Sequence, residues 1–167
     1  MDLVTYPHPA LLAKTRPLTP EEVVSEEVRS RIEEMREIMH GSEGVGLAAP
    51  QVAWSVRLLL ISPEGKPESD KVLINPVIRR RRGKVTGEEG CLSFPGIFVQ
   101  VERARDVDLE YLDEEGKLCK ETAAEFPARV IQHELDHLEN ILLLHRMSPA
   151  DRVRVKRDLE ALSRKED

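Results

Sequence analysis

The sequence predicts an α+β fold, because its strand-like and helix-like segments are separated along the chain instead of alternating. Strand-like segments follow one another between residues 56 and 112, and helical periodicity is confined to the segments before and after them. A regular strand–helix alternation, which builds parallel sheets, is not found. The 167 residues have the length of one domain.

The composition narrows the class of protein. Apolar residues make up 40% and aromatic residues 4% of the chain, so the core must be built from Leu, Ile, Val and Met. With 25 Lys and Arg against 31 Asp and Glu, the net charge of −6 argues against a dedicated DNA or RNA binder. No aliphatic run exceeds four residues, so neither a membrane span nor a secretory signal is expected. Two cysteines, Cys91 and Cys119, predict a cytoplasmic protein with reduced thiols and no disulfide scaffold.

The first 41 residues predict an extended arm followed by a helix. Three prolines are spread over residues 1–18 and favour an extended chain. Residues 19–22 (Thr-Pro-Glu-Glu) form a capping box with proline at the first helical position, which predicts a helix from about residue 20 to 40. Apolar residues at steps of three or four mark its buried face: Val24, Val28, Ile32, Met35 and Met39.

The middle of the chain predicts strands. Residues 44–51 (Gly-Val-Gly-Leu-Ala-Ala-Pro-Gln) contain small residues that allow a close backbone approach. Strand-like segments then follow at residues 56–62, 71–80, 97–103 and 106–112, and the last two alternate apolar and polar residues. Residues 113–116 predict a turn.

Two further helices are predicted after the strands. One runs from about residue 125 to 138, with Pro127 in its first turn. The other is capped by residues 148–151 (Ser-Pro-Ala-Asp) and extends to about residue 163.

A metal-binding pattern lies inside the helix at 125–138. Residues 133–137 read His-Glu-Leu-Asp-His, and residues four apart on a helix share one face, so His133 and His137 can bind one ion. Glu134 lies beside them and is placed to act on water held by that ion. The opposite face is apolar, which favours a helix packed on a core over an exposed polar helix: Ile131, Leu135, Leu138 and Leu142.

Two histidines leave a catalytic metal one protein ligand short, and the spacing alone leaves its identity open. The metzincin continuation would place Gly and His where the chain has Asn140 and Leu143. A small zinc peptidase could instead use Glu160. Cys91 offers a thiolate next to a glycine, although a lone cysteine is more often a small buried apolar residue.

Three segments together resemble the motifs of peptide deformylases, in the order and at the separation of that family. They are residues 44–51, residues 89–93 (Glu-Gly-Cys-Leu-Ser) and residues 132–138 (Gln-His-Glu-Leu-Asp-His-Leu). The resemblance runs from about Tyr6 to Met147. It implies small, mixed and mostly antiparallel sheets around the His-Glu-x-x-His helix. It also implies a catalytic domain at residues 1–148. The charged C-terminal helix or tail at residues 149–167 is expected to belong to the same domain.

The resemblance implies an activity and a set of residues that perform it. The activity is removal of the N-formyl group from the formyl-methionine of newly synthesised polypeptides, with release of formate. The implied metal ligands are Cys91, His133 and His137. The implied catalytic groups are Glu134 as general base and acid, with the Gln51 amide and the Leu92 backbone N–H as oxyanion donors. The implied substrate-binding residues are Gly46 and Gly90 for the peptide backbone, and Val45, Phe126 and Val130 for the methionine side chain.

The implied cofactor is one Fe²⁺ per chain, for which Zn²⁺, Ni²⁺ or Co²⁺ can substitute. A thiolate and two imidazoles suit iron or zinc, so the ligand set by itself does not separate them. The implied partners are N-formylmethionyl nascent polypeptides, without membrane or DNA.

The chain departs from the usual family pattern at four positions. Asn140 stands where a glycine is usual, and asparagine tolerates the left-handed conformation that such a helix end needs. Leu143 and His145 replace a usual Phe and Asp, and Phe98 replaces a basic residue on the loop after the cysteine motif. None of these is a ligand or the catalytic acid, but the loop that carries Phe98 is expected to bind substrate differently.

Besides the zinc peptidase, a non-catalytic binding module with the same fold is an alternative function. Such a module would be expected to lose Glu134, Gln51 or Cys91, and all three are present. A transient ribosome contact is suggested by the four arginines at residues 79–82 and by the basic residues of the last helix. The favoured interpretation is a solvated hairpin tip at residues 79–82 and a solvated face of the last helix, where Asp and Glu are interleaved with the basic residues.

Overall fold

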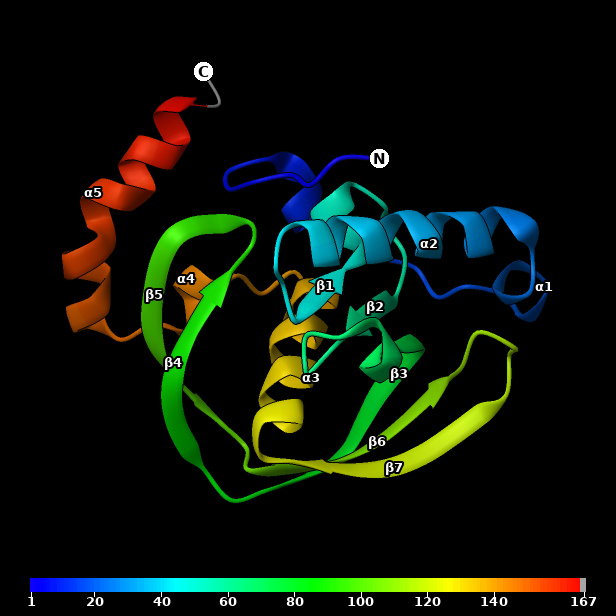
Figure 1. The fold of residues 1–167 in the computed structure, drawn as a ribbon. Coiled ribbons are helices and arrows are strands. Elements are labelled where there is room, and N and C mark those ends of the chain that lie inside the picture. Colours follow the sequence, from blue (N-terminus) through cyan, green and yellow to red (C-terminus); the bar gives the residue numbers. More distant parts are fainter. Residues whose placement is uncertain (166–167) are drawn as a thin grey trace.

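The structure is a computed structural model that describes residues 1–165, and its fold is α+β, as predicted. Figure 1 shows α3 at the centre of the molecule, between a two-stranded hairpin and a larger sheet. The larger sheet has the order β1 (Gly46–Ala48), β2 (Leu58–Ile61), β3 (Lys71–Arg82), β6 (Asp106–Leu112) and β7 (Leu118–Ala124). The hairpin consists of β4 (Val85–Cys91) and β5 (Phe94–Arg103). Both sheets pair their neighbouring strands antiparallel.

Within residues 1–165, α2, α3 and α5 are the long helices, and the other helical elements are three or four residues long. The α-helices are α1 (Pro20–Val23), α2 (Glu26–Gly41), α3 (Glu125–Leu138), α4 (Leu143–Arg146) and α5 (Pro149–Lys165). The 3₁₀ turns are η1 (Pro9–Leu12), η2 (Ala49–Val52) and η3 (Pro67–Ser69). None of the helices within residues 1–165 combines the length and the apolar character needed to cross a membrane.

The helix predicted from about residue 20 to 40 is in fact two helices. The capping box forms as predicted, because Thr19 Oγ1 accepts from the Glu22 N–H and Glu22 Oε1 accepts from the Thr19 N–H. The Ser25 hydroxyl then donates to the Glu22 carbonyl at 2.7 Å and accepts from the Val28 N–H, so it ends α1 and caps α2. The prediction of a buried Val24 was therefore wrong, since its side chain is 45% exposed.

The larger sheet is covered by α2 on one face and by α3 on the other. Alternate residues of β2 point to opposite faces: Leu58 and Leu60 pack in the apolar cluster of α2, and Leu59 and Ile61 in that of α3. The apolar face of α3, with Ile131 among its members, is thereby fixed against the sheet, and its other face is directed at β4 and β5.

A third apolar cluster joins the hairpin to the end of the chain. It contains Phe94, Ile97, Val99 and Val101 of β5 and Val155 and Leu162 of α5. The predicted cap of this helix forms, because Ser148 Oγ accepts from the Asp151 N–H. The charged terminal helix is thus packed on the hairpin that carries Cys91.

The strand predictions were right in the middle of the sheet and wrong at its edges. The segment 106–112 matches β6, but 56–62 shortens to β2, and the segments 71–80 and 97–103 extend to β3 and β5. Strands β1, β4 and β7 were not predicted. β4 reads Val-Thr-Gly-Glu-Glu-Gly-Cys, and only Glu89 of this strand is buried, so no apolar alternation announces it.

Candidate metal centre

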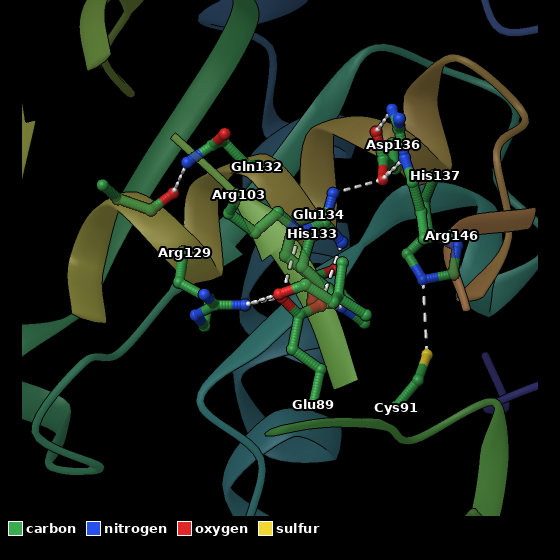
Figure 2. Close-up of polar contacts among 12 residues, drawn as sticks. Glu89, Cys91, Arg103, Arg129, Gln132, His133, Glu134, Asp136, His137 and Arg146 are labelled. Carbon is green, nitrogen blue, oxygen red and sulfur yellow. Dashed lines mark hydrogen bonds and ion pairs between the residues drawn. The ribbon is translucent and has the colours of Figure 1, made fainter. Parts of the chain in front are cut away.

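Three candidate metal ligands, Cys91, His133 and His137, lie close together in the structure, although Cys91 and His137 are 46 residues apart in the sequence. Cys91 lies at the end of β4, and His133 and His137 lie one turn apart on α3. The ligand atoms of the three residues all lie within 4.8 Å of one another, and Cys91 Sγ is 3.3 Å from His137 Nε2 (Figure 2). The two imidazoles are buried, with His133 8% and His137 2% exposed.

The ring of His133 is oriented by a buried glutamate. Glu89 Oε1 lies 2.8 Å from His133 Nδ1, which leaves Nε2 directed away from it. This is the usual way in which a second residue fixes the orientation of a metal-binding histidine. Glu89 also accepts two hydrogen bonds from Arg103, at 3.0 and 2.9 Å, and one from Arg129 at 2.6 Å. Burial alone would raise the pKa of Glu89, but the hydrogen bonds from His133 and Arg103 outweigh it and lower this pKa to about 2.

Glu134 lies beside the same ring in an opposite environment. Its side chain is buried, Oε1 is 3.9 Å from His133 Nε2, and Oε2 has no hydrogen-bond partner among the described residues. Burial raises the pKa of Glu134 to about 7. Gly46 of β1 makes room for it, because a Cβ at position 46 would be 2.8 Å from Glu134 Oε1.

These residues fit a divalent transition metal. A thiolate and two imidazoles form a common donor set for zinc and iron. Burial lowers the pKa of His137 well below its usual value, so this ring is neutral, which is the form that binds metal. Glu134, whose buried Oε2 has no partner among the described residues, lines one cavity with Cys91 and His133.

Gln51 reaches the centre from the loop after β1. Its Nε2 is 3.5 Å from Cys91 Sγ and donates to Ser93 Oγ at 3.1 Å, while Oε1 accepts from the Ala48 N–H at 2.9 Å. The amide is therefore held with its N–H group towards the cysteine. Leu92 follows Cys91 directly and packs close to Gly44.

A cavity of about 430 Å³ opens onto the centre. It brings together eight of the residues that the sequence analysis assigned to substrate, metal and catalysis: Val45, Gly46, Gly90, Cys91, Phe126, Val130, His133 and Glu134. Leu92 also lines it, whereas Gln51 and His137 are not among its lining residues. A second cavity of about 580 Å³ lies elsewhere on α3, against Gln132 and Asp136, and contains none of the three candidate ligands.

The positions that depart from the family pattern are accommodated locally. Asn140 has φ 57°, as expected for a left-handed helix end, and its Nδ2 donates to the Ala13 carbonyl at 2.8 Å. His145 Nδ1 accepts from the Leu142 N–H at 2.9 Å, so it satisfies a backbone donor at the start of α4. Leu143 is buried, and Phe98 is 53% exposed at the mouth of the cavity.

Sequence reasoning missed the residues that support the ligands. Glu89 was part of a quoted motif, but its partners Arg103 and Arg129 were not singled out. Arg103 also donates to Asp136 at 2.6 Å, and Asp136 accepts from Arg146, so a chain of charged groups connects Glu89 to Arg146 (Figure 2). The pairing of one arginine among many with one acid is not visible in a sequence.

Glu160, the third ligand of the alternative peptidase, lies away from the histidines. It is on α5 and lines a separate cavity with Tyr6 and Leu144. The cluster that the described residues form contains Cys91 instead. The zinc peptidase hypothesis therefore has no structural support.

The α+β fold defines a metal-dependent hydrolase together with a candidate metal set of one partly buried cysteine and two buried histidines, beside a carboxylate with one oxygen unpaired among the described residues. A family model described as polypeptide deformylase matches residues 1–153. The chain belongs to the peptide deformylase family.

Individual relatives agree with this assignment. The chain is 38% identical over 165 residues to a peptide deformylase of Alkalilimnicola ehrlichii, covering 98% of this chain and 91% of that protein. It is 37% identical to the chloroplastic/mitochondrial peptide deformylase 1B of Arabidopsis thaliana, of whose length it spans 60%, with 99% of this chain covered. Among solved structures, the Plasmodium falciparum peptide deformylase matches with a TM-score of 0.94 at 33% identity, covering 98% of this chain and 96% of that one.

Proposed function

We propose that this chain hydrolyses the N-formyl group of formyl-methionine at the centre formed by Cys91, His133 and His137, and releases formate. The family to which the chain belongs removes this group from nascent polypeptides and depends on a metal. The single observation that carries the residue-level assignment is Glu134 Oε2, a buried oxygen without a partner among residues 1–165. It lies where an acid and base for this reaction is needed.

The proposed cofactor is one Fe²⁺ per chain, held by Cys91, His133 and His137. When bound, a divalent cation lowers the pKa of water and polarises a carbonyl oxygen. Iron is favoured by the family resemblance, and the donor set accepts Zn²⁺, Ni²⁺ or Co²⁺ in its place.

Glu134 is the proposed proton carrier. Its pKa of about 7 lies near the pH at which a general base both accepts and releases a proton readily. It takes a proton from the attacking water and passes it to the nitrogen of the leaving amine, so that the C–N bond of the formamide breaks. Gly46 keeps the space beside this carboxylate open.

Gln51 and Leu92 are the proposed donors to the oxyanion that forms on the formyl oxygen. The Gln51 amide is oriented by Ala48 and Ser93, so its N–H needs little reorganisation during the reaction. Removal of one such donor typically costs about 3–4 kcal/mol in the transition state.

The substrate is proposed to bind as an extended peptide between β1 and β4. Each of these strands has one paired neighbour within the described part of the chain, β2 and β5 respectively, so each offers a backbone edge. Gly46 and Gly90 lie on these edges, and a peptide can add to them by main-chain hydrogen bonds. Val45, Phe126 and Val130 line the same cavity and are proposed to receive the methionine side chain.

The test is a formate-release assay on protein purified without oxygen, combined with metal analysis. We expect about one metal ion per chain and formate from formyl-Met-Ala-Ser, with no acetate from the matched acetyl-Met-Ala-Ser. Cys91→Ala should lose both metal and activity, whereas Cys119→Ala, at a cysteine outside the cluster, should keep both. Stoichiometric metal in Cys91→Ala, or no formate from the metal-loaded wild type, would refute the assignment.

We further propose a cytoplasmic location, where a reducing environment keeps Cys91 as a thiol. Residues 1–148 are proposed to form the catalytic domain, and the terminal segment 149–167 is proposed to belong to the same domain. Burial of Val155 and Leu162 against β5 supports this, and residues 166–167 lie outside the described part of the chain. A transient ribosome contact stays a prediction, to be tested by cosedimentation. Arg79 and Arg82 pair with Glu110 and Asp108, which favours a solvated surface there.

A further inference from the structure

Phe98 is a large apolar side chain exposed at the mouth of the catalytic cavity. It is 53% exposed and lines the cavity together with Cys91 and Glu134. In the hairpin it is the register partner of Gly90. A Cβ at position 90 would be 2.7 Å from Phe98 Cε1, so the ring lies over the glycine backbone, in the space that a side chain at 90 would need.

The strand that carries this ring is held from its other side by α5. Arg154 Nη2 donates to the Phe98 carbonyl at 2.6 Å, and Asp151 Oδ2 accepts from the Gln100 N–H at 2.9 Å. Both contacts are to backbone groups of β5. The backbone at Phe98 is therefore held before any peptide binds, and a preorganised backbone contributes to selectivity at little entropic cost.

The apolar lining of the cavity comes from two sources. Val45, Phe126 and Val130 are already assigned to the methionine side chain. Leu92, Pro95 and Phe98, all from the hairpin, form a second apolar surface of the cavity, and of these Phe98 lies beside Gly90. A peptide that paired with the edge of β4 at Gly90 would therefore meet Phe98.

We propose that Phe98 is a specificity-determining residue, whose exposed ring selects apolar side chains at the residues following the formyl-methionine. This inference rests on the proposed function of the centre. The occupant of the surface is the substrate itself, because the surface is continuous with the cavity that holds the reacting end. Contact with a hydrocarbon side chain removes the exposed ring from water, which favours apolar over polar residues at that place.

The experiment compares formate release from pairs of formyl peptides that differ at one position. The pairs are formyl-Met-Phe-Ser against formyl-Met-Ser-Ser, and formyl-Met-Ser-Phe against formyl-Met-Ser-Ser. In the wild type we expect kcat/KM to be about tenfold higher for the aromatic member of at least one pair, mostly through KM. In Phe98→Ser this ratio should fall to about 1, and in Phe98→Leu most of it should return.

Binding of the product peptides Met-Phe-Ser and Met-Ser-Ser, measured by calorimetry, gives a readout that does not depend on turnover. Val153→Ser is the matched control, because Val153 is 79% exposed on α5 and does not line this cavity. It should leave the ratio unchanged.

The outcomes separate this inference from the function on which it rests. An unchanged ratio in folded Phe98→Ser, or an equal loss of kcat for all peptides, overturns the role of Phe98 while leaving formate release in place. Absence of formate from every peptide with the metal-loaded wild type would overturn both.

Discussion

Glu89 and Glu134 are two buried glutamates on either side of the His133 imidazole ring. They are similarly buried but differ in their hydrogen-bond partners and in their pKa values. Glu89 is 7% exposed and Glu134 is 4% exposed. Glu89 Oε1 contacts Nδ1 of His133 at 2.8 Å, whereas Glu134 Oε1 lies 3.9 Å from Nε2 of the same ring. The pKa of the first is lowered to about 2, and that of the second is raised to about 7.

The difference arises from the partners of the two carboxylates. Desolvation disfavours the charged form of both. At Glu89 two arginines and His133 supply hydrogen bonds that outweigh it, and at Glu134 one oxygen has no partner in the described chain. One carboxylate is thus fixed as an anion that orients His133, a proposed metal ligand, and the other is left able to exchange a proton. Two carboxyl groups whose environments separate their pKa values are a common basis for dividing structural and chemical roles.

Glu134→Gln is the change with the largest expected effect on activity. The amide keeps the shape of the side chain and removes its basicity, so metal content and folding should persist. Formate release should fall by about 10²–10⁴-fold, the typical contribution of general acid–base catalysis. Metal analysis and the formate assay on the same preparation check both parts.

Glu88→Gln is the matched control, since Glu88 is exposed and lines the same cavity. It should lower activity far less than Glu134→Gln. Loss of metal in Glu134→Gln would instead make this residue a ligand, and near-normal turnover would mean that another group transfers the proton.

Glu89→Gln should act on stability and metal binding before it acts on the chemistry. It leaves Arg103, which is buried, without one of its two carboxylate partners. Breaking a buried ion pair in this way typically costs about 3–5 kcal/mol of unfolding free energy. Loss of the partner of His133 should weaken metal affinity by about 10–100-fold.

Urea unfolding and metal competition measure these two effects. Glu110→Gln is the control, because its partner Arg79 is exposed and the pair should add little to stability. A Glu89→Gln protein as stable as the wild type, with undiminished metal affinity, would contradict the structural role given to this carboxylate.

Local signals in the sequence predicted the middle of the fold well. The ends of α3 and β6 were predicted correctly, because their apolar periodicity is regular and bounded by turn residues. The break between α1 and α2 was missed, since the hydroxyl of Ser25 ends one helix and caps the next without disturbing the apolar spacing that follows. Strand β4 was missed because an edge strand above a catalytic cavity carries glycine and glutamate where a core strand carries apolar residues.

The residues of the candidate site that lie close together in the sequence were predictable, and those brought together from distant elements were not. The spacing of His133 and His137 marks a metal site within one helix, but Cys91 had to be supplied by the resemblance to a family. The network around Glu89 could not be predicted, because its arginines come from β5 and α3 and the chain offers many other arginines. The sequence does not show whether Glu89 or Glu134 receives these arginines. The packing of α3 against the hairpin decides it.

Arg129→Met tests whether the number of partners around Glu89 matters. Arg129 donates to Glu89 at 2.6 Å and to the carbonyls of Val101 and Val85 at 2.9 and 2.8 Å. Since Arg103 remains, the loss should be about 2 kcal/mol, the typical size for hydrogen bonds to a charged group. Urea unfolding should place this variant between the wild type and Glu89→Gln, and a larger loss than that of Glu89→Gln would contradict the leading role of Arg103.

Asn140→Gly should give the smallest effect, because it lies at a helix end and removes no charged group. At φ 57° glycine is less strained than asparagine, which favours the variant by a few tenths of a kcal/mol to about 1 kcal/mol. The variant also loses the hydrogen bond from Nδ2 to the Ala13 carbonyl at 2.8 Å, which is worth about 1 kcal/mol, and a longer one to the Leu11 carbonyl at 3.4 Å, which is weaker. The two effects nearly cancel, so the urea midpoint should shift little.

Asn75→Gly is the sharper comparison. At φ 51° this variant gains the same relief of backbone strain, but it loses hydrogen bonds to both the N–H and the carbonyl of Leu18, each 2.9 Å long. We therefore expect Asn75→Gly to be clearly less stable than Asn140→Gly, and the reverse order would mean that backbone strain outweighs these side-chain hydrogen bonds.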